Sequence, residues 1–351
     1  MQNRGCVMPQ ADSPNLQSAI SIAVIIPVHN GGENLQRCLQ ALSASIRPAD
    51  EVIVVDDGST EQSANIASSF HAQVISLIGA PHGPAFARNR GAEVARGDLL
   101  VFLDADVLAH PNTLGLFEKY FAENPEVAAI FGSYDASPPG RGLVSRYKNL
   151  LHHYTHQHSQ REASTFWAGC GSIRRNVFSQ IGGFTESYAR PSIEDIELGV
   201  RLRQATCRVW LCKDIQVTHL KNWTLQSMLT SDIRDRAIPW TRLILQQGRL
   251  STDLNLDNKN RLGAMVAWLA VLSFLIGIIS TPVFIGTLLL LVAVVLLNRD
   301  LYIFFARHGG FRFALVAIGL HILYLLYSSL IFASMAGLTR LGFVKFRNTQ
   351  H

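Results

Sequence analysis

The feature that most constrains the fold is a series of short apolar segments separated by helical segments between residues 21 and 107. Segments 21–28, 51–55, 72–78 and 99–103 are short and rich in apolar and β-branched residues, a pattern typical of buried strands. The stretches between them have helical spacing. Strands that alternate with helices predict an α/β fold whose mainly parallel, Rossmann-like sheet is covered on both faces.

Polar residues follow the predicted strands at their carboxyl ends. Pro27 and Asn30 follow the first strand, Asp56 and Asp57 the second, and the Asp104-Ala105-Asp106 triplet the fourth. In an open α/β sheet, the ligand crevice lies outside the carboxyl ends of the strands. We therefore expect these residues to meet at one crevice, although Pro27 also suits a strand end and Asp-Gly-Ser is also an ordinary turn.

The carboxylates of Asp104 and Asp106 stand one residue apart, and two such charges repel unless a cation or a donor-rich ligand lies between them. Hard oxygen ligands suit Mg²⁺ or Mn²⁺, which commonly binds one or two carboxylates together with substrate phosphates. The sequence therefore predicts a divalent metal here. A polar turn after the strand is the alternative.

Further along, Glu194 and Asp195 precede a predicted helix, where a carboxylate can act as a base or simply cap the helix. His219 ends the last predicted strand of the core. It can contact a metal or a diphosphate there, or it can be a structural or solvated histidine. Arg88 opens the helix before the Asp104 strand, where it can face a nucleobase or phosphate, or only solvent.

The chain is 48% hydrophobic, and the excess is concentrated after residue 262. Three apolar stretches approach the length of about 20 residues that a membrane-spanning helix needs. The predicted organisation is a disordered tail, a catalytic domain, amphipathic interfacial helices with a linker, a membrane region and a second tail. These parts cover 1–20, 21–221, 222–261, 262–339 and 340–351, with spans at about 262–280, 281–298 and 313–338.

The distribution of positive charge predicts the orientation in the membrane. Lys259 and Arg261 precede the first span, and Arg299, Arg307 and Arg312 follow the second. The positive-inside rule puts these segments and the domain before them in the cytoplasm. We expect an integral protein of a bacterial inner (plasma) membrane. The net charge of +5 includes no basic run, so no nucleic-acid partner is predicted.

Seven motifs resemble a family 2 glycosyltransferase of the GT-A fold, over residues 21–219. They are VIIPVHN (24–30), VIVVDDGST (52–60), GPAFARNRG (83–91), LLVFLDADV (99–107), FWAGCGSIRR (166–175), IGGF (181–184) and PSIEDIELGVRL (191–202). The resemblance implies an inverting enzyme that moves a sugar from a nucleotide-diphosphate sugar, such as a UDP- or GDP-sugar, to an acceptor.

The resemblance also implies roles for individual residues. Asp104 would contact the ribose, Asp106 the metal with His219 as a further ligand, and Asp195 would be the base, supported by Glu194. The expected nucleotide-sugar contacts are Pro27, Asn30, Asp56, Asp57, Arg88, Asp104, Trp167 and Gly169. Trp167 and Gly169 would form the floor of the sugar and acceptor pocket, although a buried core tryptophan is equally compatible.

One departure from the family's membrane synthases affects the predicted product. Processive synthases carry a Gln-x-x-Arg-Trp motif after the base, whereas this chain has Arg234-Asp235-Arg236-Ala237-Ile238-Pro239-Trp240. We therefore predict a single addition, with Arg236 and Trp240 near a membrane-side acceptor entrance. The spans favour a membrane lipid or lipid-linked saccharide as acceptor. The alternatives are a processive polysaccharide synthase and an inactive nucleotide-sugar-binding protein.

Overall fold

The computed structural model describes residues 20–140, 142–247 and 258–343 of the chain. The chain forms two compact units, Met1–Pro139 with His156–Lys221 and Gly140–Thr155 with Asn222–His351. Almost all of the predicted tail 1–20, and the part of the predicted tail 340–351 that follows residue 343, lie outside the described residues.

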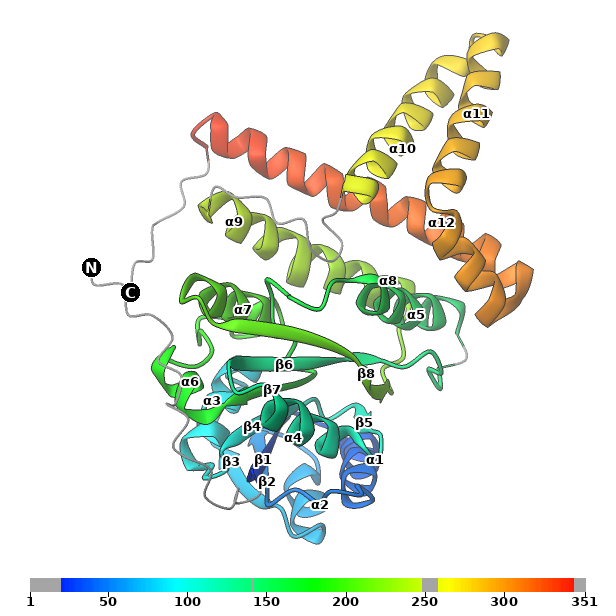
Figure 1. The fold of residues 1–351 in the computed structure, drawn as a ribbon. Coiled ribbons are helices and arrows are strands. Elements are labelled where there is room, and N and C mark those ends of the chain that lie inside the picture. The colour runs from blue at the N-terminus through cyan, green and yellow to red at the C-terminus, as the bar shows by residue number, and fades with distance from the viewer. Residues whose placement is uncertain (1–19, 141, 248–257, 344–351) are drawn as a thin grey trace. The chain divides into compact units, whose positions relative to one another are not determined.

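The first unit is built on a sheet of eight strands in the order β3-β2-β1-β4-β7-β6-β8-β5 (Figure 1). The strands are β1 (Ile22–Val28), β2 (Glu51–Asp57), β3 (Gln73–Leu77), β4 (Leu99–Leu103), β5 (Val107–Ala109), β6 (Val127–Tyr134), β7 (Cys170–Arg174) and β8 (Arg208–His219). β1 to β4 are parallel, and β7 runs antiparallel to both of its neighbours. The predicted mainly parallel α/β sheet is therefore confirmed.

The strand order reverses at β1. The chain first adds β2 and β3 on one side of β1 and then crosses back to place β4 on its other side. The carboxyl ends of β1 and β4 therefore flank a topological switch point, where open α/β sheets bind ligands. The sheet topology accounts for the position of the candidate site.

Alternate residues of each strand face opposite layers of helices, as the pleat requires. Val24 and Ile26 belong to one hydrophobic core with α1, α2 and α4, whereas Ala23 and Ile25 belong to a second core with α3, α6 and α7. The helices are α1 (Gly32–Ser43), α2 (Ser63–Ser69), α3 (Pro84–Val94), α4 (Thr113–Glu123), α6 (Arg175–Gln180) and α7 (Glu194–Gln204).

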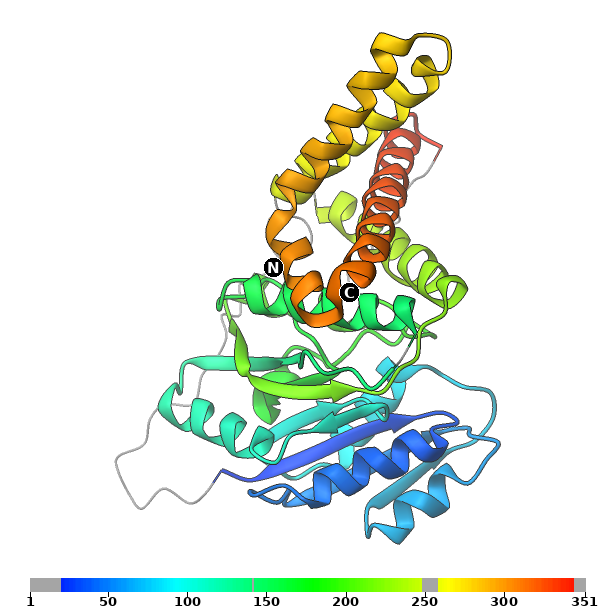
Figure 2. The same cartoon turned by 90° about the vertical axis from the view of Figure 1, so that its right-hand side faces the viewer.

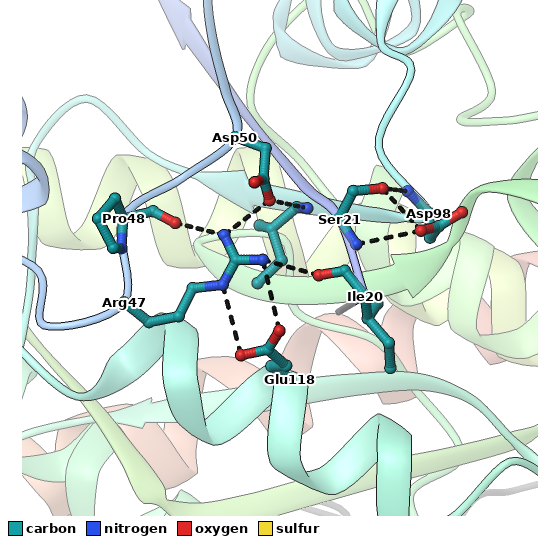
Figure 3. A network of polar contacts seen from close by, with 8 residues as sticks. Ile20, Ser21, Arg47, Pro48, Asp50, Asp98 and Glu118 are labelled. Carbon is teal, nitrogen blue, oxygen red and sulfur yellow. Dashed lines mark hydrogen bonds and ion pairs between the residues drawn. The ribbon is translucent and has the colours of Figure 1, made fainter. Parts of the chain in front are cut away.

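A polar network fixes the amino ends of the strands, at the edge opposite the switch point (Figure 3). Arg47 donates to the backbone carbonyl of Ile20 at 2.7 Å and to Asp50 at 2.6 Å, and it also reaches Glu118 of α4. Asp50 in turn accepts from the Ile22 amide at 2.7 Å. One guanidinium therefore connects the starts of β1 and β2 with a covering helix.

The second unit is helical. It contains most of α5 (Leu143–His158), then α8 (Leu225–Thr230), the π-helix η1 (Ser231–Ala237), α9 (Ile238–Gln247), α10 (Asn258–Gly277), α11 (Thr281–Leu297) and α12 (Arg299–Arg340). Figure 2 shows α10 and α11 side by side as a hairpin. By length and composition, α10 and α12 can each cross a membrane, whereas α11 is shorter, with 17 residues.

The helix that carries the third predicted span differs from the expectation. The apolar stretch 313–338 belongs to the longer α12, which begins at Arg299 and is bent at Gly310. Gly310 has φ 79° and ψ 171°, a conformation that only glycine adopts readily. Before the bend, Leu301, Tyr302 and Phe305 are buried rather than exposed.

A buried polar cluster joins three elements of this unit. Lys148 of α5 and Asp232 of η1 form an ion pair at 2.5 Å and are only 3% and 6% exposed. Tyr327 of α12 donates its hydroxyl hydrogen to the other carboxylate oxygen of Asp232 at 2.6 Å. The cluster therefore sets the register of α5, η1 and α12.

Lys148→Met should lower the free energy of unfolding of the second unit by about 3–5 kcal/mol, because it leaves Asp232 buried without its cation. The double variant Lys148→Met/Asp232→Leu should be less destabilised than Lys148→Met alone. Thermal unfolding of the full chain in detergent measures both. The control is Lys259→Met, which removes only an exposed ion pair with Asp300. If Lys148→Met unfolds at the control temperature, the pair has no role in register.

Candidate active site

A cavity of about 500 Å³ opens at the carboxyl ends of β1 and β4. This volume is in the range of small-molecule sites. The structure brings six of the predicted site residues together on its wall, drawn from three strand ends and one helix. They are Pro27, Asn30, Asp57, Arg88, Asp104 and Asp106.

The loop after β1 is held by the loop after β2. Asn30 has φ 53°, a left-handed conformation that asparagine tolerates better than most residues. Its amide oxygen accepts from the Thr60 N–H at 2.9 Å, and its own N–H donates to the Ser59 hydroxyl at 2.9 Å. The backbone at the cavity edge is therefore fixed before any ligand binds.

The two neighbouring carboxylates that end β2 have different tasks. Asp56 accepts from the Ser59 amide at 2.9 Å, which is the ordinary turn that the sequence left open. Asp57 accepts from the amides of His82 at 2.9 Å and Gly83 at 2.7 Å. Asp57 lines the cavity and Asp56 is not on its wall, so Asp57 fixes the loop before α3 at the cavity edge.

Arg88 bridges two carboxylates that lie far apart in the sequence. Its guanidinium donates to Asp104 at 2.7 Å and to Glu194 at 2.9 Å, and the residue is 4% exposed. Burial alone would lower the pKa of Arg88, but Asp104, Glu194 and Asp195 outweigh it and raise the pKa. Arg88 is thus a permanent cation in the wall, not the solvated residue that the sequence also allowed.

The two carboxylates of the Asp104-Ala105-Asp106 triplet are in different electrostatic environments. Burial raises the pKa of Asp104, and the neighbouring Arg88 offsets this only in part. Burial also acts on Asp106, but His219 and Lys221 outweigh it and hold the pKa of Asp106 below its usual value. Asp106 is therefore the more strongly ionised of the two.

Asp106 and His219 lie close together. Their Oδ2 and Nε2 atoms lie 3.6 Å apart, and the His219 ring is stacked on Tyr134 with centroids 4.3 Å apart. In the described parts of the chain, no three His, Cys, Asp or Glu side chains converge to hold a metal by themselves. Asp106 supplies a carboxylate oxygen of the kind that Mg²⁺ or Mn²⁺ binds together with substrate phosphates, whereas an imidazole such as that of His219 is a less usual ligand for Mg²⁺.

The predicted base region lies beside the wall. α7 begins at Glu194, which is 4% exposed and accepts from Arg88 and from the Ser192 amide. Asp195 accepts from the Ala168 amide at 3.1 Å, which orients its carboxylate. Asp195 is thus attached to the segment that carries Trp167 and Gly169.

That segment is tightly packed. A Cβ on Gly169 would lie 2.5 Å from the Trp167 ring, so only glycine fits there. Trp167 meets Tyr134 edge-on with centroids 4.7 Å apart. Trp167, Gly169, Glu194, Asp195 and His219 are not on the cavity wall. Glu194 is joined to the wall through Arg88, His219 through Asp106, and Gly169 through its carbonyl, which accepts from the Asp104 amide at 3.2 Å.

Sequence reasoning missed several wall residues, among them Gly83, Arg190, Pro191 and Lys221. The signal for Gly83 was its position before Pro84 at a helix start, and its φ is 100°. Arg190 and Lys221 could have been found as basic residues within a few positions of Asp195 and His219.

Arg236 and Trp240 belong to the second unit, in η1 and α9. Arg236 donates to Nε2 of His152 at 3.1 Å, which fixes the His152 proton on Nδ1. The predicted place of these two residues at an acceptor entrance stays a prediction.

Arg88→Met should lower the free energy of unfolding by about 3–5 kcal/mol, because it leaves Glu194 and Asp104 without their shared cation. Arg88→Lys should be intermediate, since an ammonium lacks the planar fork that spans two carboxylates. Thermal unfolding of the purified chain measures both variants. The exposed Arg96 supplies the control, Arg96→Met. Equal melting of Arg88→Met and the control would contradict the bridging role.

Comparison with known proteins finds a family that matches part of the chain and a solved structure with a similar fold. Residues 23–182 match the family described as Glycosyl transferase family 2. A pre-mycofactocin glycosyltransferase of Mycobacterium tuberculosis is 30% identical over 227 residues, which cover 60% of this chain and 46% of that protein. The glycosyltransferase YibD of Escherichia coli, itself uncharacterized, is 37% identical over 27% of this chain and 29% of its own length. The chain thus spans less than half of either relative.

A solved structure confirms the fold class. The mannosyltransferase PcManGT of Pyrobaculum calidifontis superposes with a TM-score of 0.55 at 16% identity, over 90% of this chain and 90% of that chain. At this identity the likeness concerns the fold. It agrees with the expected GT-A-type sheet followed by a helical region.

Proposed function

We propose that this chain moves a sugar from a nucleotide-diphosphate sugar to an acceptor hydroxyl or phosphate with inversion, because its residues 23–182 match Glycosyl transferase family 2. The observation that carries the proposal is the cavity at the switch point of the sheet. Asp57, Arg88, Asp104 and Asp106 lie on one wall of it.

The proposed donor is a UDP- or GDP-sugar. PcManGT, which shares the fold, was solved with GDP-Man and Mn²⁺. In this chain Pro27, Asn30 and Asp57 would contact the nucleoside, and Asp104 the ribose. Asp56 would contribute by shaping the turn after β2, because its carboxylate bonds to that turn.

Asp106 and His219 would hold a divalent metal, Mg²⁺ or Mn²⁺, together with oxygens of the donor diphosphate. When bound, such a metal supplies positive charge to the departing diphosphate. Arg88 holds Asp104 in place beside this pair through its 2.7 Å hydrogen bond.

Asp195 is proposed as the base that takes the proton of the acceptor hydroxyl. Its two carboxylate oxygens accept hydrogen bonds from the amides of Ala168 and Ile196, which fixes the orientation of the carboxylate. Glu194 is occupied by Arg88 and the Ser192 amide, so it supports Asp195 by fixing the start of α7. Trp167 and Gly169, next to Ala168, would form the floor of the sugar and acceptor pocket.

The proposed acceptor is a membrane lipid or lipid-linked saccharide. The helices α10, α11 and α12 expose large apolar side chains, such as Leu289 at 67% and Leu315 at 54%. A lipid bilayer is the surrounding in which such exposure is favourable. With Lys259, Arg261 and Arg299 at the helix ends, the proposed orientation keeps the catalytic unit cytoplasmic, at the bacterial inner membrane.

A single addition is the proposed outcome. The Gln-x-x-Arg-Trp pattern of processive synthases is absent, and Arg236 and Trp240 alone remain of it near the proposed acceptor entrance. The intact Asp104, Asp106 and Asp195 set favours an active enzyme over an inactive nucleotide-sugar-binding protein.

The test of the reaction is a set of radiolabelled UDP- and GDP-sugars incubated with membranes that contain the protein. We expect label in the lipid fraction with wild type and about 10²–10⁴-fold slower transfer with Asp195→Asn, the usual contribution of a general base. Arg96→Gln serves as the control. Unchanged turnover of Asp195→Asn would refute its role as base, and label only in long polymer would refute single addition.

Metal dependence is tested separately. EDTA should abolish transfer by wild type, because without a metal no divalent cation stabilises the negative charge of the departing diphosphate. Added Mg²⁺ or Mn²⁺ should restore transfer. Asp106→Ala should lose most activity and resist restoration at metal concentrations that suffice for wild type. A full rate in EDTA would contradict the metal assignment.

A further inference from the structure

Arg190 is a cation on the cavity wall whose side chain the protein does not use. It lines the same cavity as Asp104 and Asp106. Among the described residues, its guanidinium has no hydrogen-bond or ion-pair partner. The other arginines nearby differ, because Arg88 is bound to Asp104 and Glu194, and Arg90 to Glu93 and Glu186.

The backbone around Arg190 is nevertheless fixed on both sides. On one side, Ala189 is packed on Gly83 so closely that a Cβ on Gly83 would lie 2.7 Å from the Ala189 carbonyl carbon. On the other side, Pro191 restricts the chain, and the Ser192 amide donates to Glu194 at 2.8 Å. An ordered backbone that presents an unused guanidinium to a cavity is suited to a ligand.

The charges of the wall indicate which ligand. Arg88 is neutralised within the wall by Asp104 and Glu194. Arg190 and Lys221 are the remaining wall cations, and Asp106 lies on the same wall as both. The planar fork of a guanidinium matches phosphoryl oxygens in a bidentate way, so an anionic phosphate is the group that Arg190 fits.

We propose that Arg190 binds the β-phosphate of the nucleoside diphosphate and joins nucleotide binding to the helix that carries Asp195. This inference rests on the proposed function. In the transfer, the acceptor oxygen bonds to the anomeric carbon and its proton passes to Asp195. The bond from that carbon to the β-phosphate oxygen breaks, and its electron pair stays on the phosphate. Arg190 would stabilise the charge that develops there.

The experiment measures binding of UDP, GDP, UMP and GMP to the purified full-length protein in detergent with Mg²⁺, by calorimetry. With the nucleobase that wild type binds, Arg190→Gln should weaken the diphosphate about tenfold or more, the size expected for a charge-assisted contact. Its affinity for the monophosphate should stay within about twofold of wild type. Arg190→Lys should be intermediate, and the exposed Arg96→Gln should match wild type in both.

Three outcomes would overturn the assignment. Equal losses for mono- and diphosphate would place Arg190 at the nucleoside or show a distorted loop. No loss for either would remove it from nucleotide binding. If both nucleotides bind as to wild type but the transfer assay shows a raised KM for the acceptor, the charge of Arg190 belongs to an acceptor phosphate instead. Failure of wild type to bind any of the four nucleotides would contradict the proposed function itself, which separates the two claims.

Discussion

The ion pairs of Arg88 set the arrangement of the candidate site. A buried ion pair contributes little net stability when compared with apolar side chains of similar volume, because its desolvation offsets its attraction. A guanidinium that contacts Asp104 of the sheet edge and Glu194 at the start of α7 therefore matters mainly for position. It keeps two negative groups close without letting them repel, and it joins Asp104, the proposed ribose contact, to Glu194, the neighbour of the proposed base Asp195.

The helix that carries Arg88 connects the rest of the site. At its start, Asp57 accepts from the Gly83 amide and so ties α3 to β2. One residue after Arg88, Asn89 exchanges two hydrogen bonds of 2.9 Å with the backbone of Phe184. Three segments that are far apart in the sequence thus share one rigid element. The loop that carries Arg190 is packed on Gly83, whose amide donates to Asp57. Movement of that loop would therefore change the position of Asp57.

The part of the site that was predictable is the part that depends on local pattern. Apolar runs located the strands, and strand ends in a parallel sheet must share an edge, so Pro27, Asp57 and Asp104 were expected together. Pattern could not separate Asp56 from Asp57, since both suit a turn and only the position of Gly83 decides between them. The Arg88–Glu194 pair joins residues 106 positions apart and needs the tertiary fold. The bend of α12 was missed because hydropathy does not register the φ of Gly310.

The second unit combines a buried polar cluster with exposed apolar side chains. One buried ion pair lies inside it, formed by Lys148 and Asp232 with Tyr327, whereas many large apolar side chains of α10, α11 and α12 are exposed. In water this distribution would be unfavourable, because apolar area stays exposed while ions are desolvated. In a bilayer the exposed apolar side chains would meet hydrocarbon, and the buried polar groups would need their partners all the more, since an unpaired polar group there is costly. The distribution of side chains in these helices is therefore an argument for the membrane that does not depend on their length.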